Sequence, residues 1–269
     1  MSLIYEPSGK AREYSPLAIN LYSGCGHKCN YCYVPGVLRI ERKTFDTVVN
    51  PKSNVRNILE REIKKYEYSE KQVFMSFTTD PYNPYDVTEQ LTREALKLFL
   101  KYKIPVSILT KSGLKALRDI DIMKKFGKHF KIGASLTYDN SKDSERIEGG
   151  AALPDERLQM LNNFHAEGIR TWVSFEPIMQ PEQVLNLLKK CISFVDEFQF
   201  GKLADDTRKF DWNKFLTEVV KILRSNKKEF YIKETLRKSA NVELNKNEYE
   251  MDYLTLKPFE KEVDLFSLN

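Results

Sequence analysis

Short apolar segments alternate with longer amphipathic segments along most of the chain. The apolar segments predict strands over residues 17–22, 73–77, 105–110, 131–137, 171–175 and 198–203. The amphipathic segments predict helices over residues 54–66, 89–102, 114–126, 154–167, 181–194 and 211–224. Because parallel strands need crossover connections, this alternation predicts an α/β fold with a parallel sheet. Six such units form either a partial (β/α)6 TIM-like barrel or a doubly wound open sheet.

The first loop favours the barrel, because it lacks the Gly-x-Gly-x-x-Gly pattern of a dinucleotide site in a doubly wound sheet. A chain of 269 residues suits one such domain, since single barrels of about 200–250 residues are ordinary. We expect the barrel domain over residues 1–228, with an arm over residues 1–15. Residues 229–269 include a strongly charged tail and predict a short C-terminal extension packed on the barrel.

Charge and hydropathy limit the location and the partners. The net charge is +5, from 43 basic and 38 acidic residues, which permits a polyanionic partner without requiring one. No apolar run reaches the roughly 18 residues that span a bilayer, and residues 1–6 lack the layout of a signal peptide. We therefore expect a cytoplasmic protein with no membrane partner.

Three of the four cysteines lie close together, with the spacing Cys25-x3-Cys29-x2-Cys32. Three thiolates at this spacing suit one face of an iron–sulfur cluster. A cubane cluster is normally held by four cysteines, so the fourth iron is left open for a substrate or cofactor. A structural zinc site is the alternative, in which His27 or Cys191 supplies the fourth ligand. A disulfide framework is disfavoured, because clustered thiols without a secretory signal indicate metal or redox use.

Polar side chains follow the predicted strands, where barrel enzymes build their sites. They are the cysteine loop, Asp80, Lys111, the turn over Ser135–Tyr138, Glu176 and Lys202. Ordinary roles are left open for each: Lys111 as a solvated charge, Asp80 as the start of a turn, and Glu176 as an ion-pair partner of Lys202 or Arg170. Three rim tyrosines either pack, stack on a base or relay a hydrogen atom: Tyr82, Tyr85 and Tyr138.

Several strings in the sequence are typical of one family. They are residues 22–33 (YSGCGHKCNYCY), 79–82 (TDPY), 110–112 (TKS), 118–121 (RDID) and 154–158 (PDERL). With these strings, residues 16–204 resemble the radical S-adenosylmethionine (SAM) superfamily, in the branch that is related to spore photoproduct lyase and often labelled DNA-repair-photolyase-like. The resemblance implies the partial barrel of the radical SAM type. It also implies a [4Fe–4S] cluster, SAM, and the three cluster ligands Cys25, Cys29 and Cys32.

By analogy of strand position, the resemblance implies four SAM-binding residues. Lys111 would neutralise the SAM carboxylate, and Ser135 would donate a hydrogen bond. Asp80 would lie near the SAM amino group, although the Gly-Gly-Glu string common in the superfamily is absent there. The backbone of Tyr31 would contact adenine.

The resemblance implies reductive cleavage of SAM, which produces a 5′-deoxyadenosyl radical that abstracts a hydrogen atom from the substrate. We expect a nucleic acid or nucleotide substrate, and an electron donor such as flavodoxin or ferredoxin. The alternatives are modification of a peptide or small metabolite, or a non-catalytic, metal-stabilised binding protein. The reaction class, a lyase, an isomerase or a modifying enzyme, is left open. Spore photoproduct lyase has a cysteine that donates a hydrogen atom. The one cysteine of this sequence outside the cysteine loop is Cys191, and the predicted helix that contains it places it in the core.

Overall fold

The computed structural model describes residues 2–203 and 206–261, and in this part of the chain the largest element is an eight-stranded sheet. Its strand order is β1-β2-β5-β6-β7-β8-β9-β10. The strands are β1 (Ile4–Tyr5), β2 (Leu17–Ile19), β5 (Val73–Met75), β6 (Val106–Thr110), β7 (Phe130–Ser135), β8 (Arg170–Ile178), β9 (Glu197–Lys202) and β10 (Glu229–Ile232). Neighbouring strands are parallel, apart from the antiparallel pair β1 and β2.

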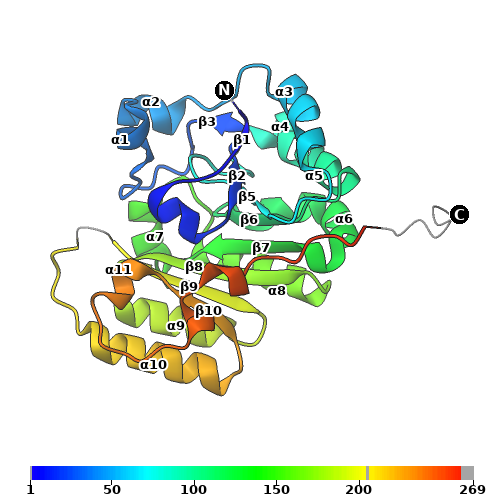
Figure 1. Cartoon of the computed structure of the whole chain (residues 1–269). Helices are drawn as coiled ribbons and strands as arrows, with labels where there is room; N and C mark the ends of the chain where they lie inside the picture. The colour runs from blue at the N-terminus through cyan, green and yellow to red at the C-terminus, as the bar shows by residue number, and fades with distance from the viewer. Residues whose placement is uncertain (1, 204–205, 262–269) are drawn as a thin grey trace, which may run out of the picture.

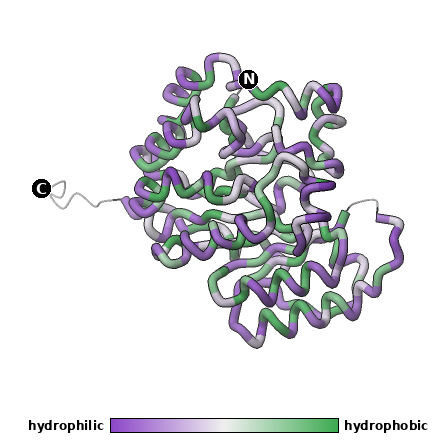
Figure 2. Tube along the Cα trace, turned by 180° about the vertical axis from the view of Figure 1, so that it is seen from behind, coloured by the Kyte–Doolittle hydropathy of each residue, from purple (hydrophilic) through white to green (hydrophobic). Residues whose placement is uncertain are grey.

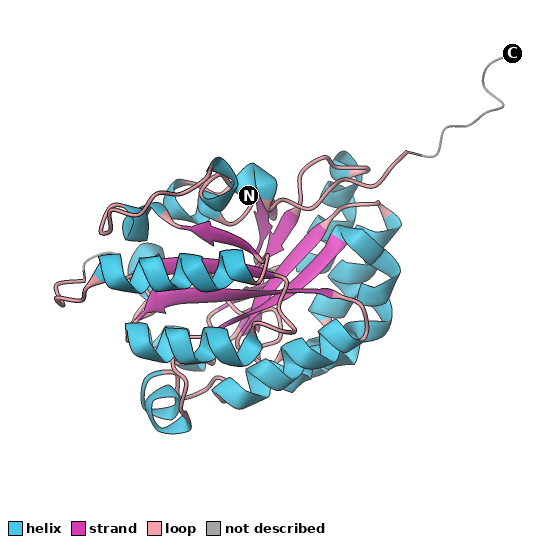
Figure 3. Ribbon diagram, turned by 90° about the horizontal axis from the view of Figure 1, so that it is seen from below, coloured by secondary structure: helices cyan, strands magenta, loops and turns pink. Residues whose placement is uncertain are grey.

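The parallel strands follow one another in chain order across the sheet. A doubly wound sheet reverses its strand order at a switch point, so that alternative is wrong. The prediction of an α/β fold with a singly wound, barrel-type parallel sheet is confirmed, and the twist of its strands is visible in Figure 3. Two short strands, β3 (Tyr22–Ser23) and β4 (Asn50–Pro51), pair antiparallel beside it.

Helices connect the strands and cover the sheet (Figure 1). The α-helices are α1 (Val34–Leu38), α2 (Arg42–Thr47), α3 (Val55–Glu62), α4 (Asp86–Glu89), α5 (Leu91–Lys101), α6 (Ile120–Met123), α7 (Ser141–Ile147), α8 (Pro154–Ala166), α9 (Pro181–Cys191), α10 (Trp212–Ser225) and α11 (Glu234–Arg237). The 3-10 helices are η1 (Gly9–Glu13), η2 (Ile63–Tyr66), η3 (Gly113–Asp119), η4 (Lys124–His129), η5 (Lys246–Glu248) and η6 (Met251–Tyr253). Hydrophilic and hydrophobic residues alternate along these helices in Figure 2, because each buries one face and exposes the other.

One segment predicted as a continuous helix is a series of shorter helices of two types. Residues 113–129, expected to form a continuous helix over 114–126, are η3, α6 and η4 in succession. Gly113 and Gly127 have φ of +59° and +55°, which a right-handed helix does not accommodate. Between them, the buried carboxylate of Asp119 accepts hydrogen bonds from Arg93 and Arg118. These contacts determine the path of the backbone where η3 ends and α6 begins.

Side chains alternate between the two faces of the sheet, as the period of a strand requires. On β8, Phe175 belongs to the main core, whereas Trp172 belongs to a second, smaller apolar cluster. The Trp172 ring covers Gly133 of β7, where a Cβ would lie 2.5 Å from the ring. The same alternation puts Ser174 and Glu176 on the face of Trp172. This face therefore becomes polar toward the carboxyl ends of the strands.

The N-terminal arm joins the two edges of the sheet. β1 pairs with β2 at one edge. At the end of η1, Glu13 Oε1 accepts hydrogen bonds from the Tyr231 hydroxyl at 2.9 Å and from the Glu234 N–H at 3.0 Å, next to β10. The segment expected as an arm thus bridges the first and the last parallel strand.

The segment predicted as a C-terminal extension begins with β10, a strand of the sheet itself. The chain then runs past the amino ends of the strands, where the Leu254 carbonyl accepts from Lys131 Nζ at 2.8 Å and the Leu256 N–H donates to Gln72 at 3.0 Å. The domain boundary at residue 228 stays a prediction. The last part of the predicted extension, residues 262–269, lies outside the described residues, as do residues 1 and 204–205 of the predicted barrel domain.

Candidate functional site

The cysteine loop lies just beyond β2 and β3, at the carboxyl edge of the sheet. In Figure 1, α1, α2 and α7 lie toward this end of the molecule, whereas α6 lies toward the other. Backbone hydrogen bonds hold the loop from two sides: the Cys25 N–H donates to Phe45, the Asn30 N–H to Ile147, and the Gly150 N–H to the His27 carbonyl. The loop conformation is therefore determined by α2 and by the segment between α7 and α8.

The three thiols of the loop are free. Cys29 is buried, whereas Cys25 and Cys32 are partly exposed. Burial raises the pKa of Cys25, and burial also raises the pKa of Cys29 to about 11, against the opposing charge of Lys111. Such thiols keep their protons until a metal centre displaces them, since the thiolate is the form that binds a metal.

The three thiols of the loop fit the ligands of an iron–sulfur cluster. Within residues 2–203 and 206–261, no group of three or more Cys, His, Asp or Glu side chains could hold one metal ion. Around a cubane cluster each thiolate binds a different iron, so the thiols need not converge on one point.

Neither proposed fourth zinc ligand is placed for that role. His27 Nδ1 lies 3.1 Å from the Gly150 carbonyl, and Nε2 lies 2.9 Å from Asp80. Cys191 is buried at the end of α9, and the chain then leads into the amino end of β9, opposite the loop. The core position predicted for Cys191 is confirmed.

Asp80 joins the cysteine loop to the loops after β5 and β6. Its carboxylate accepts hydrogen bonds from the Tyr82 N–H (2.8 Å), Thr110 Oγ1 (2.7 Å), Ser112 Oγ (3.0 Å) and the Lys111 N–H (2.8 Å). Burial alone would raise the pKa of Asp80, but the charge of His27 and these hydrogen bonds lower it well below its ordinary value. In this structure the Asp80 carboxylate therefore holds several loops together. From the sequence it was considered only as the start of a turn.

Tyr31 and Lys111 meet in a buried network around Glu148. The Tyr31 hydroxyl donates to Glu148, and Arg157 Nη2 lies 2.6 Å from the same carboxylate. Lys111 Nζ is 4.0 Å from Glu148 and 5.7 Å from the centroid of the Tyr31 ring. Burial alone would raise the pKa of Glu148, but the charges of Arg157 and Lys111 lower it. Ser135 lies beside this network, because its carbonyl accepts from Arg157 at 2.8 Å.

Glu148 and the role of Arg157 were not predicted from the sequence. Arg157 lay within the quoted 154–158 string, and Glu148 directly precedes Gly149 and Gly150. The pair Gly149-Gly150 was the sequence signal that could have indicated a close approach of two loops here. A Cβ on Gly150 would lie 2.0 Å from the Gly26 carbonyl, so only a glycine lets this segment approach the cysteine loop.

Glu176 is paired, but with neither expected partner. Its Oε2 accepts from Lys233 Nζ at 2.6 Å, and from the hydroxyl of Tyr14. Arg170 instead contacts Glu197 and Glu229, and Lys202 Nζ lies 5.5 Å from the ring of Trp212. The alternative of an ion pair therefore applies to Glu176, but its partner is Lys233, which follows the unpredicted strand β10, and not Lys202 or Arg170.

The three rim tyrosines have different environments. Tyr82 is 2% exposed and donates to Asp119, and Tyr138 is 4% exposed, so both are packing residues. Tyr85 is 48% exposed and is available for contact with a ligand.

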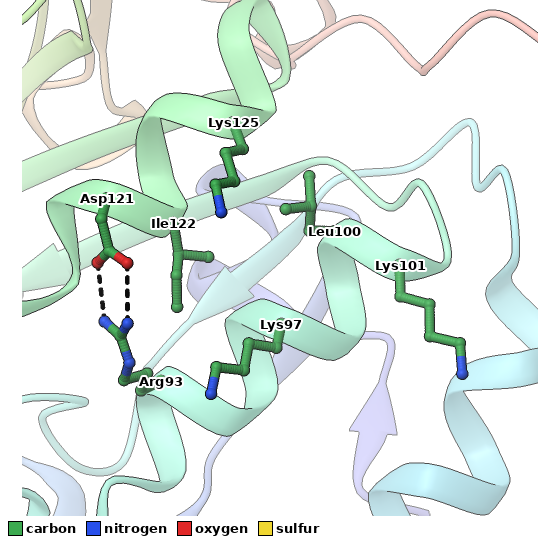
Figure 4. Close-up of a pocket in the computed structure, with 7 residues that line it drawn as sticks. All are labelled: Arg93, Lys97, Leu100, Lys101, Asp121, Ile122 and Lys125. Carbon is green, nitrogen blue, oxygen red and sulfur yellow. Dashed lines mark hydrogen bonds and ion pairs between the residues drawn. The ribbon is translucent and has the colours of Figure 1, made fainter.

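A separate hollow lies on the outer helices and is lined by basic side chains of α5 and η4 (Figure 4). There the guanidinium of Arg93 forms two hydrogen bonds, both 2.8 Å long, with Asp121. Lys97, Lys101 and Lys125 complete its basic lining. This hollow is not part of the site, because it lies on the helical layer. Across the described residues, no helix combines the length and the apolar character needed to cross a membrane.

The fold and the loop define a partial-barrel protein with a three-thiol site at the carboxyl ends of its strands. The sequence model of the radical SAM superfamily matches residues 19–200, more than half of the chain. The chain therefore belongs to the radical SAM superfamily, and the predicted family is confirmed.

Sequence relatives have no stated activity. A protein of Methanocaldococcus jannaschii, uncharacterized protein MJ0683, is 29% identical over 162 residues, which cover 60% of each chain. Uncharacterized protein ORF301 of Acidianus two-tailed virus is 29% identical over 204 residues, covering 71% of this chain and 65% of that protein. The chain thus aligns with less than two thirds of the length of these relatives.

Solved structures share the fold. SuiB of Streptococcus suis, bound to SAM, superposes with a TM-score of 0.59 at 16% identity, covering 80% of this chain and 49% of SuiB. A spore photoproduct lyase variant with bound SAM and dinucleoside spore photoproduct superposes with a TM-score of 0.59 at 15% identity, covering 81% of this chain and 76% of that chain. These neighbours agree with the predicted barrel type and include the branch that the sequence resembles.

Proposed function

We propose that this protein is a radical SAM enzyme that acts on a nucleic acid or nucleotide. The observation that carries the proposal is the loop of three free thiols at the carboxyl end of β2, in a chain that matches the superfamily over residues 19–200. Cys25, Cys29 and Cys32 would hold a [4Fe–4S] cluster. When bound, the cluster supplies one electron for the reductive cleavage of SAM to methionine and a 5′-deoxyadenosyl radical.

The four residues predicted to bind SAM divide into two groups. Lys111 is 16% exposed, and its nearest carboxylate is 4.0 Å away, so we propose that it pairs with the SAM carboxylate. Ser135 would donate its hydroxyl hydrogen bond beside it. Asp80 and Tyr31 have side chains that are occupied by protein contacts. Asp80 would therefore act near the SAM amino group by holding the loop, and Tyr31 would present its backbone to adenine.

The nucleic-acid proposal has support from the fold, the charge and the rim. One neighbour of similar fold is a spore photoproduct lyase that binds a dinucleoside. The net charge of +5 and the exposed ring of Tyr85 suit a nucleotide ligand. A peptide substrate is the second candidate, because SuiB, which superposes equally well, has been solved with the precursor peptide SuiA.

The electron donor would approach the face formed by α1 and α2. Three apolar side chains are exposed there, Val37 at 67%, Leu38 at 42% and Val48 at 50%, and Arg39 and Lys43 are exposed beside them. These helices flank the cysteine loop. An apolar patch with cationic neighbours suits an acidic protein, and we propose a flavodoxin or ferredoxin.

The test of the proposed function is anaerobic. Reconstituted protein is reduced with dithionite and given SAM, and 5′-deoxyadenosine and bound iron are measured for wild type, Cys29→Ala and Cys191→Ala. We expect wild type and Cys191→Ala to bind iron and form the nucleoside. We expect Cys29→Ala to lose both, because it removes a cluster ligand.

Cys191→Ala is the matched control, since it removes a buried thiol that lies at the opposite edge of the sheet. Protein that binds zinc and leaves SAM intact would contradict the proposal and support a metal-stabilised binding protein. Loss of iron in both variants would show that the assay reports folding, and the proposal for Cys29 would then fail.

A further inference from the structure

The helix α2 holds the cysteine loop at two points. The Phe45 carbonyl accepts a hydrogen bond from the Cys25 N–H at 3.0 Å, at the first predicted cluster ligand. Arg42 Nη2 donates to the Asn30 carbonyl at 2.8 Å and to the Cys32 carbonyl at 3.3 Å. One side chain of α2 therefore contacts the turn that carries the second and third predicted ligands.

The guanidinium of Arg42 suits this turn. The turn is closed by the Cys32 N–H, which donates to the Cys29 carbonyl at 3.0 Å. The carbonyls of Asn30 and Cys32 both face the same nitrogen of Arg42. Hydrogen bonds from a charged donor are stronger than those between neutral groups, so a positive charge is held against the backbone of the turn.

The charge of Arg42 is only partly compensated. Within the described residues its ion-pair partner is Asp46, one turn further along α2, and Nη1 lies 3.7 Å from Asp46 Oδ1. Both atoms are buried, and neither has a hydrogen-bond partner in the described part of the chain. A buried polar atom without a hydrogen bond costs stability. The position of Arg42 is therefore better explained by an effect on the cysteine loop than by stability.

A fixed cation beside this loop affects how readily an iron–sulfur cluster there is reduced. Reduction adds one negative charge to a centre that three thiolates already make negative. The reduction potential of such a cluster depends on the charges around it and on its exposure to solvent. A nearby cation favours the reduced form because unlike charges attract, whereas a nearby carboxylate favours the oxidised form.

We infer that Arg42 is a positioning residue that raises the reduction potential of the cluster, and that Asp46 limits this increase. The inference rests on the proposed function, since it concerns the cluster that the cysteine loop would hold. Arg42 acts through its charge and through the turn that it contacts. A higher potential lets a weaker reductant supply the electron that the proposed reaction requires.

The test measures the midpoint potential of the reconstituted cluster, in the absence of SAM and substrate. The protein is titrated anaerobically with dithionite and redox mediators, and the reduced cluster is followed by electron paramagnetic resonance. Arg42→Gln should lower the ratio of reduced to oxidised cluster at a fixed potential about fivefold, which is about 40 mV for one electron. This is the effect expected of one partly solvated charge, since the Arg42 side chain is 39% exposed.

Two further variants separate charge from structure. Arg42→Lys keeps the charge, and we expect its ratio to stay within about twofold of wild type. Asp46→Asn removes the opposing charge, and we expect the ratio to rise about twofold. A merely structural role of α2 does not predict opposite shifts at two neighbouring positions of one helix.

Arg61→Gln is the matched control. Arg61 is exposed near the end of α3, and the substitution makes the same change of charge and size there. We expect the wild-type potential. Bound iron is measured for every variant, so that each potential refers to protein that holds a cluster.

A wild-type potential in Arg42→Gln overturns the inference. Equal potentials of Arg42→Gln and Arg42→Lys, both below wild type, also overturn it, because the effect would then be structural. If Arg42→Gln binds no iron, Asp46→Asn decides, and an unchanged potential in that variant overturns the inference.

The outcomes for this inference and for the proposed function are distinguishable. Opposite shifts in Arg42→Gln and Asp46→Asn support the inference even if the protein leaves SAM intact, and only the proposed reaction then fails. Formation of 5′-deoxyadenosine by wild type, with equal potentials in every variant, overturns this inference alone. Wild type that binds no iron overturns both.

Discussion

At the scale of single residues, close backbone contacts determine the shape of the cysteine loop. Gly24 precedes the first cysteine and has φ of +81°, and a Cβ there would lie 2.2 Å from the Val48 carbonyl. Gly36, in α1, has open space around the position of a Cβ. Of these two glycines near the cysteine loop, only Gly24 stands at a position that requires both a positive φ and the absence of a side chain.

We expect Gly24→Ala to destabilise the protein by at least about 1 kcal/mol, because it adds strain and a clash with backbone. Reconstitution should then give less bound iron than wild type. Gly36→Ala should be neutral or stabilising by up to about 1 kcal/mol, since alanine is the better helix residue. Urea unfolding and iron content check both variants, and equal effects of the two substitutions would contradict the steric argument.

At the scale of elements, a carboxylate on α3 anchors the N-terminal arm. Glu62 Oε2 accepts hydrogen bonds from the N–H groups of Leu3 (2.7 Å) and Ile4 (3.3 Å) and from the Ser2 hydroxyl (3.0 Å). Burial alone would raise the pKa of Glu62, but these hydrogen bonds lower it below its ordinary value of 4.5. β1 thus depends on an ionised side chain, and so does the start of the arm that carries Tyr14.

A lowered pKa in the folded state means that this contribution is complete above the ordinary value of 4.5 and is lost as the pH falls through the folded value. We expect Glu62→Gln to lower the free energy of unfolding by about 1 kcal/mol at pH 7, because charged acceptors bind more strongly than neutral ones. The difference from wild type should shrink below pH 4.5.

Urea unfolding at pH 7 and at acidic pH measures this difference. Glu60→Gln is the control, since Glu60 is exposed on the same helix. A difference between wild type and Glu62→Gln that stays constant with pH would show that the carboxylate charge has no part in anchoring the arm.

At the scale of the whole molecule, basic side chains lie on two separate surfaces. One is the face of α1 and α2 beside the cysteine loop, with Arg39 and Lys43. The other is the hollow on the outer helices, with Lys97 and Lys101 (Figure 4). Electron transfer favours the first surface, because a protein donor must approach the loop that would hold the cluster.

We expect the pair Arg39→Glu and Lys43→Glu to slow flavodoxin-driven formation of 5′-deoxyadenosine about tenfold at low ionic strength, since charge steers the encounter. The rate with dithionite should stay at the wild-type value. The pair Lys97→Glu and Lys101→Glu makes the same charge change and should leave both rates unaltered. A slower rate in this second pair alone would place the donor on the outer helices.

Much of this protein could be predicted from its sequence, because the signals were local. The alternation of strand and helix predicted the parallel sheet, and the spacing of Cys25, Cys29 and Cys32 indicated the family that the match over residues 19–200 confirms. β10 was missed because its apolar residues 230–232 stand between charged ones. The helix expected over residues 114–126 is interrupted at Asp119, whose contacts with Arg93 and Arg118 are not recorded by periodicity.

The tertiary structure alone decided which side chains meet at the carboxyl ends of the strands. Asp80 reaches His27, Glu148 reaches Tyr31 and Arg157, and Glu176 reaches Lys233. Each pair depends on strand register and loop packing between segments that are apart in the sequence, and no periodicity records them. The physical reason is that hydrophobic pattern and ligand spacing are properties of neighbouring residues, whereas an ion pair between β8 and the end of β10 exists only once the sheet has formed.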